Sequence, residues 1–218
     1  MGKGFDRRVA PDASLDLVRA VQRRAPSHLA GGVALSGLHL FHRLSDDIDL
    51  FFHDHEALRA LVRDLPSVAV ECHAAISIAR DSGTFVRATI EAAGRPVALD
   101  LVYEPIPDIE PPSGPIEGII AESLADLRAA KLTCILSRAE PRDLVDLLFL
   151  DRAGFPPERD LGLALRKDAG IDPGVLAWLL HDFPTTPLPR MLLPLTVAEL
   201  TAFRDDLAER LRAVAVRG

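Results

Sequence analysis

The chain has little cysteine, tryptophan or tyrosine. Its 218 residues include two cysteines, one tryptophan and one tyrosine. Cys72 and Cys134 each lie in an apolar context, and two isolated cysteines form neither a disulfide framework nor a paired metal motif. A reduced, cytoplasmic compartment is the simplest interpretation.

Long apolar runs and an excess of positive charge are also missing. No run approaches the length of a membrane span, and the N-terminus, MGKGFDRRVAPD, lacks the apolar core of a signal peptide. The formal net charge of −7 argues against a protein that coats nucleic acid through overall positive charge. We therefore expect a cytoplasmic protein without membrane contact.

The composition is that of an ordinary globular protein, with 48% hydrophobic and 26% charged residues. A segment rich in proline and acids, residues 105–115, predicts an irregular connector. We place the domain boundary there, with an α/β domain at 1–110 and a helical domain at 111–218.

Periodicity predicts elements of both kinds in the first domain and helices alone in the second. In the first domain we expect helices at 13–24, 33–41 and 55–64, the last closed by Pro66. We also expect strands at 47–52, 68–73, 76–80, 84–91 and 96–103, with turns at 81–83 and 93–95. The second domain is expected to hold helices at 123–137, 141–152, 157–168, 173–181 and 196–214.

Two aspartates interrupt the apolar strand predicted at 47–52. Asp47 and Asp49 are two residues apart, so their side chains leave the strand on the same face. Two neighbouring like charges are costly to bury unless a cation neutralises them, and Mg²⁺ is the usual partner of carboxylate oxygens. Asp100, in VALDLVYE, is a third acid in a similar apolar strand. The alternative is that these are ordinary acids on a solvated face.

The residues just before this strand suit phosphate binding. Gly31 and Gly32 precede a helical segment and could present backbone N–H groups to phosphate oxygens, although a bare Gly-Gly pair is more often only a tight turn. Arg43 and Ser45 lie in the following loop, where a guanidinium and a hydroxyl could also hold phosphate. Surface solvation of Arg43 is the competing interpretation.

Two further patterns suggest roles that are mainly structural. The spacing of His39, His42, His53 and His55 resembles metal motifs, but we expect surface or loop histidines rather than a zinc site. Trp178 lies among leucines at helical spacing, so we expect it in the core.

Several motifs in order resemble one protein family. The signature of AbiEii/AbiGii-type nucleotidyltransferase toxins, a branch of the DNA polymerase β-like superfamily, is similar to five runs of this chain. These runs are GGVAL, HRLSDDIDLF, LDLV, Lys131-Leu132 and RDLVDL at 142–147. The resemblance covers about residues 29–150, and the part from Asp151 matches no motif. Val33 stands where this branch commonly has Thr, and the missing hydroxyl would weaken one phosphate contact without removing the backbone donors.

The resemblance implies a nucleotidyltransferase fold, a mixed sheet with flanking helices followed by a helical half. It implies that Asp47 and Asp49 bind Mg²⁺ or Mn²⁺ and that Asp100 is the third catalytic acid. Nucleotide-binding roles fall on Gly31, Gly32, Arg43, Ser45 and Lys131. Arg138, Arg142, Asp143 and Asp146 are expected to organise the site, and the alternative is an ion network in which the two acids pair with Lys131, Arg138 or Arg142.

The resemblance also implies an activity and partners. The expected enzyme moves a nucleoside monophosphate from an NTP to an acceptor hydroxyl, on RNA such as tRNA. It would be the toxin of a toxin–antitoxin or abortive-infection system with a cognate antitoxin. The alternatives are an antibiotic-type nucleotidyltransferase with a small-molecule acceptor, and a non-catalytic nucleotide- or partner-binding module of the same fold.

Overall fold

The computed structural model describes residues 4–92 and 95–217 and divides the chain into two compact units, Met1–Ser123 and Leu124–Gly218. The division falls later than the 110/111 boundary favoured by the sequence. Residues beyond the connector stay with the first unit because they pair with its sheet: Leu29 donates to the Ile120 carbonyl at 2.9 Å, and Glu122 donates to the Leu29 carbonyl at 3.0 Å.

The first unit contains a five-stranded mixed sheet in the order β1-β2-β5-β4-β3. Its strands are β1 (His28–Ala30), β2 (Asp47–Phe52), β3 (Ala75–Asp81), β4 (Phe85–Ala92) and β5 (Arg95–Tyr103). Strands β2 and β5 are parallel, and the other neighbours are antiparallel. The mixed α/β class is confirmed, together with four of the five predicted strands. The turn predicted at 93–95 falls partly on residues 93 and 94, outside the described residues.

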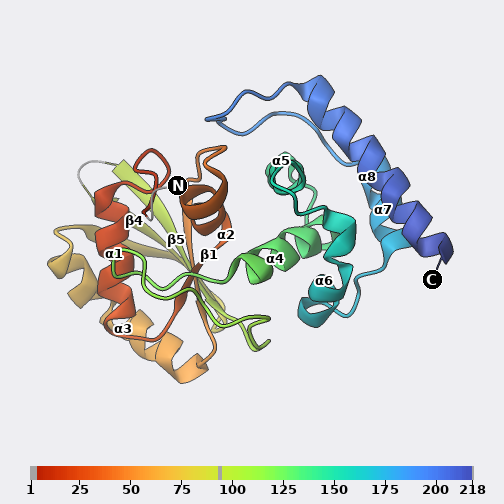
Figure 1. Cartoon of the computed structure of the whole chain (residues 1–218). Helices are drawn as coiled ribbons and strands as arrows, with labels where there is room; N and C mark the ends of the chain where they lie inside the picture. Colours follow the sequence, from red (N-terminus) through yellow and green to blue (C-terminus); the bar gives the residue numbers. More distant parts are fainter. Residues whose placement is uncertain (1–3, 93–94, 218) are drawn as a thin grey trace. The chain divides into compact units, whose positions relative to one another are not determined.

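The two faces of this sheet differ. Alternate residues of β2 (Ile48, Leu50 and Phe52) are buried, as are Leu99 and Leu101 of β5. Helix α3 (His55–Glu71) packs against β2, β3 and β5, and α1 (Asp12–Gln22) packs against α3 (Figure 1). The other residues of β2 (Asp47, Asp49 and Phe51) are half-buried and belong to the opposite face. The apolar face therefore carries the core, and the acids lie on the other side.

Helix α3 corrects two predictions. It runs through Pro66 to Glu71, so the expected helix end at Asp64 and the strand at 68–73 are both wrong. Proline costs about 3 kcal/mol inside a helix because it removes one hydrogen bond and crowds the preceding turn. Leu61, Leu65 and Val68 are each at most 2% exposed, and their helical spacing continues across the proline. Burial of this apolar face outweighs the proline.

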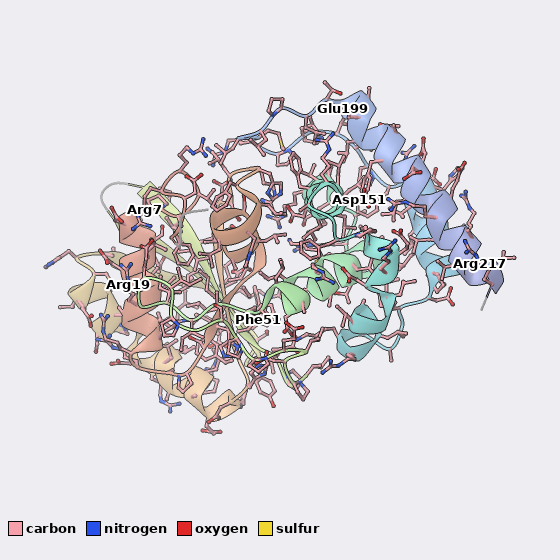
Figure 2. All side chains as sticks on the ribbon, viewed as in Figure 1. Arg7, Arg19, Phe51, Asp151, Glu199 and Arg217 are labelled. Atoms are coloured by element: carbon pink, nitrogen blue, oxygen red, sulfur yellow. The ribbon has the colours of Figure 1, made fainter. Side chains whose placement is uncertain are left out.

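A short helical segment links β1 to β2. It starts as α2 (Gly31–Ala34), continues as a π-helix at Leu35–Leu40 and ends at Phe41, whose φ of 54° is left-handed. Residues 104–123, which follow β5, contain no named strand or helix. Hydrogen bonds of Glu117 connect this segment to the N-terminal part of the unit. The Glu117 carboxylate accepts a hydrogen bond from Arg7 at 2.6 Å, and Arg19 donates to the Glu117 carbonyl at 2.8 Å. Both arginines are labelled in Figure 2.

The second unit is helical, as predicted. It contains α4 (Leu124–Ser137), α5 (Pro141–Arg152), a 3₁₀ turn (Pro157–Arg159), α6 (Leu161–Lys167), α7 (Pro173–His181) and α8 (Val197–Arg217). In Figure 2, Asp151 is on α5, and Glu199 and Arg217 are on α8. Among the described residues, no helix is both long enough and apolar enough to cross a membrane.

The core position predicted for Trp178 is wrong. Leu176 and Leu180 are buried on α7, but Trp178 is 75% exposed. Nearly every residue of α7 is apolar, so the sequence does not show which face of this helix is turned inward.

Candidate active site

Three carboxylates gather on the polar face of the sheet in the first unit. Asp47 and Asp49 belong to β2, where their apolar neighbours Ile48 and Leu50 face the core. Asp100 of β5 is the register partner of Asp49, and Asp47 pairs with Ala98 in the same parallel ladder. Because register partners on adjacent strands share a face, the three acids form one cluster. The sequence predicted this group.

Arg87 joins the acids and was not predicted. It is the register partner of Asp100 on β4, and its Nε and Nη2 atoms donate to the two oxygens of that carboxylate at 2.8 and 2.5 Å. Hydrogen bonding to Asp100 raises the pKa of Arg87 above its usual range, and the charges of Asp47 and Asp49 act in the same direction. The sequence alone does not reveal this contact, because it depends on the register between β4 and β5.

The Gly-Gly turn lies directly against the acids. Gly31 has a φ of +63°, and a Cβ atom placed on it would lie 2.0 Å from Oδ2 of Asp49. A Cβ atom on Gly32 would lie 2.4 Å from Oγ of Ser45 and 3.0 Å from a terminal nitrogen of Arg43. Any side chain at either position would occupy this space. The turn that begins α2 therefore lies beside the β2 carboxylate and the loop before it.

Arg43 is a buried part of this loop rather than a solvated surface residue. It is 3% exposed, and its guanidinium donates to the Leu44 carbonyl at 2.9 Å. Ser36 fixes the backbone here, donating from its hydroxyl to the Arg43 carbonyl at 2.6 Å and accepting from the Arg43 N–H at 3.2 Å. The competing interpretation of Arg43 as a solvated side chain is wrong.

The other predicted charged residues form a separate cluster in the second unit. Nζ of Lys131 lies 3.2 Å from Asp143 and 2.8 Å from Asp146, and all three residues are almost completely buried. Arg138 donates to both oxygens of Asp143 at 2.8 and 2.9 Å. This is the ion network that the sequence left open as the alternative. A nucleotide contact by Lys131 stays a prediction.

The charges in this network balance one another. Burial alone would raise the pKa of Asp143, but the neighbouring Lys131 and the hydrogen bonds from Arg138 hold it below its ordinary value. Burial opposes the charged form of Arg138, yet hydrogen bonding to Asp143 keeps its pKa above the usual range. Arg142 lies 2.5 Å from Glu140.

The structure thus groups the predicted residues in two sets. The first unit brings together Gly31, Gly32, Arg43, Ser45, Asp47, Asp49 and Asp100, with Arg87 added. The second unit brings together Lys131, Arg138, Asp143 and Asp146. The first set combines groups that can bind a cation and phosphate, and the second set resembles a structural ion network.

Solved structures share the fold of this chain. MenT4, a nucleotidyltransferase toxin from Mycobacterium tuberculosis H37Rv, aligns with a TM-score of 0.66 and 18% identity over 97% of this chain and 88% of its own. JHP933 from Helicobacter pylori aligns with a TM-score of 0.61 and 20% identity, over 95% and 92% of the two chains. At such identities the likeness shows the fold. A comparison with curated proteins gives no match.

The family follows from the sequence itself. Residues 17–215 match the family described as "Nucleotidyl transferase AbiEii toxin, Type IV TA system". The chain belongs to this family of nucleotidyltransferase toxins, which confirms the resemblance carried by the motifs. The match extends through the helical part beyond Asp151, where no motif was recognised.

Proposed function

We propose that this chain is a metal-dependent nucleotidyltransferase that moves a nucleoside monophosphate from an NTP to an acceptor hydroxyl on RNA, such as a tRNA. The observation that carries this proposal is the acid cluster of β2 and β5. Asp49 and Asp100 are register partners, Asp47 shares their face, and Gly31 lies against the Asp49 carboxylate. Carboxylates and a backbone turn in one place are what an NTP and its cation require.

The residues present fit a divalent cation. Three carboxylates share one face of the sheet, and Arg87 supplies a guanidinium to Asp100. Carboxylate oxygens are the ligands preferred by Mg²⁺ and Mn²⁺. Asp47 and Asp49 would hold the ion, which when bound would neutralise charge on the triphosphate and polarise the phosphorus that is attacked.

The chain's own groups would orient the two reactants. The N-terminus of α2 follows Ala30, which has no polar side-chain atom to cap it, so backbone N–H groups at Gly31 and Gly32 suit phosphate oxygens. Ser45 and Arg43 flank the same turn. Asp100 would accept a hydrogen bond from the acceptor hydroxyl and take its proton. The new bond joins this oxygen to the α-phosphorus, and the bond to pyrophosphate breaks.

Roles in the second unit rest on the resemblance and on the ion network. By the resemblance, Lys131 would contact the nucleotide in addition to its ion pairs with Asp143 and Asp146. Arg138, Arg142, Asp143 and Asp146 would keep that part of the unit in place. Family membership supports an antitoxin as partner, since the family is one of type IV toxin–antitoxin systems.

The test is transfer of label from an NTP. The full chain is incubated with Mg²⁺, total RNA and each α-³²P-labelled NTP in turn, and the products are separated by size. We expect label in RNA with one or more NTPs, and no incorporation of label when EDTA is present from the start. We expect the double variant Asp47→Asn, Asp49→Asn to remain folded and to transfer nothing.

Glu91→Gln is the matched control, since Glu91 is an exposed acid near the end of β4 and shares the register face of Arg87. It should retain wild-type transfer. Label in a small acceptor alone would favour the antibiotic-type alternative. Tight NTP binding without transfer to any acceptor would favour the non-catalytic module and contradict the proposal.

A further inference from the structure

Two histidines and an aspartate meet at the end of β2 that is remote from Asp47. His28 begins β1 and is the register partner of Phe51, while His53 directly follows β2. Asp108 comes from the connector after β5. One ligand atom from each residue lies within 4.8 Å of the other two. Three segments that are distant in sequence therefore converge on one point.

The hydrogen bonds of His53 fix which ring nitrogen carries a proton. Nδ1 of His53 lies 2.7 Å from the backbone carbonyl oxygen of Glu104. A carbonyl oxygen only accepts, so Nδ1 must be the donor. In the neutral ring the lone pair is then on Nε2, and Nε2 lies 3.0 Å from Oδ1 of Asp108. Two acceptors face each other at this distance only with a proton or a cation between them.

His28 turns toward the same carboxylate. Its Nδ1 lies 3.6 Å from Oδ2 of Asp108, and the two imidazole rings meet edge to face with centroids 5.4 Å apart. A proton on His53 would satisfy one contact of the carboxylate, but it gives no reason for the second ring. Around a tetrahedral zinc ion with bonds of about 2.0–2.1 Å, neighbouring ligand atoms are about 3.3 Å apart. The 3.0 Å from Nε2 of His53 to Oδ1 and the 3.6 Å from Nδ1 of His28 to Oδ2 place the two nitrogens at similar distances, one from each oxygen of the same carboxylate.

We propose that His28, His53 and Asp108 form a second metal site, selective for Zn²⁺ or a similar transition metal, with a fourth position open to water or an external ligand. Imidazole nitrogens favour such ions over Mg²⁺, which prefers oxygen. The Glu104 carbonyl that receives Nδ1–H of His53 is the kind of outer contact that orients metal-binding histidines. The ion would fasten the connector to β1 and β2.

This site is distinct from the acid cluster. His53 is four residues beyond Asp49, which corresponds to about 13 Å along an extended strand. The donor sets differ as well, with two imidazoles and one carboxylate here against three carboxylates there. The two sites can therefore be occupied and tested independently.

The experiment is a calorimetric titration of the full, metal-free chain with ZnCl₂. Excess MgCl₂ is present throughout, so that Mg²⁺ occupies the carboxylate cluster. We expect one zinc ion per chain and a rise in Tm on binding. Titration with Co²⁺ should give the visible absorption of a tetrahedral ion with nitrogen ligands. His53→Asn and His28→Asn should each weaken zinc binding by about 100-fold or more.

Three further variants show whether zinc is held by these residues and by no others. His181→Asn removes an exposed histidine of α7 and should bind zinc as the wild type does. Asp108→Asn tests the site from the connector, in case a strand variant fails to fold. Asp47→Asn, Asp49→Asn should lose transfer but retain zinc. Absence of zinc binding by the wild type, unchanged binding by both His28→Asn and His53→Asn, or loss of zinc in the Asp47, Asp49 variant would each overturn the inference.

Discussion

The two charged clusters of this molecule look alike in sequence and differ in structure. Asp49 and Asp100 interrupt apolar strands, and Asp143 and Asp146 interrupt an apolar helix. In the second unit, Lys131 contacts both acids and Arg138 contacts Asp143, and the two acids are completely buried. In the first unit, three acids share a face with Arg87, and Asp47 and Asp49 are only half-buried.

Under the proposed function, the second cluster would stabilise the fold and the first would bind a ligand. A buried carboxylate held by two cations leaves little demand for a third, whereas neighbouring half-buried carboxylates repel one another and attract a divalent ion. Substitutions in the second unit should therefore act on stability, and those in the first should act on turnover.

The largest expected effect comes from the same substitution made in each cluster. Asp49→Asn should lower kcat by about 10³-fold, or about 4 kcal/mol of transition-state free energy, because a metal ligand is lost. Its stability should be unchanged or slightly higher, since repulsion from Asp47 and Asp100 is relieved. Asp146→Asn should lower the urea midpoint instead, because it weakens the partner of buried Lys131. Single-turnover transfer and urea unfolding of both variants provide the measurements.

The second prediction concerns Lys131. Lys131→Met leaves two buried acids close together without this cation, which should cost about 3 kcal/mol in the free energy of unfolding. A residue that served only to contact nucleotide would behave differently, raising KM while leaving the urea midpoint unchanged. Arg152→Met is the control and should leave both quantities unchanged, because Arg152 of α5 forms an exposed ion pair with Glu199. A stable Lys131→Met protein with a raised KM would end the structural interpretation of this lysine.

Elements with strong local signals could be predicted from the sequence. Strand β2 and helices α5 and α7 have the predicted bounds, since Asp47 begins the strand and Pro141 and Pro173 begin the two helices. Helix α3 could not be predicted beyond Asp64, because only packing against the sheet shows why the helix tolerates Pro66.

The missing parts of the sites are contacts made by strand pairing. Arg87 meets Asp100 through the register of β4 with β5. The pairing of β1 with β2 brings His28 near His53. The sequence pattern grouped His53 only with His39, His42 and His55, and we expected no metal site among those four. Local pattern identifies a residue's chemistry, and tertiary pairing supplies its partners.

The third prediction uses two glycines with positive φ, Gly31 at +63° and Gly83 at +88°. Alanine at either position adopts a left-handed conformation that costs about 1–2 kcal/mol. At Gly31 the new Cβ would also meet the Asp49 carboxylate, while a Cβ on Gly83 would have no neighbouring atom within 4 Å. Gly31→Ala should therefore lower both the free energy of unfolding and the transfer activity. Gly83→Ala should lower the free energy of unfolding alone. Equal transfer by both variants would show that the turn does not need to approach Asp49.

The smallest expected effect is at Arg87. Arg87→Gln removes the bidentate grip on Asp100, so the carboxylate loses its fixed orientation, and kcat should fall by about tenfold. The side chain is 47% exposed, and solvent screening should limit the stability loss to about 1 kcal/mol or less. Arg80→Gln is the matched control, because Arg80 is the register partner of Arg87 and lies over the same Phe85 ring. If both variants transfer equally well, Arg87 belongs with the structural ion pairs of the second unit rather than with the acids beside it.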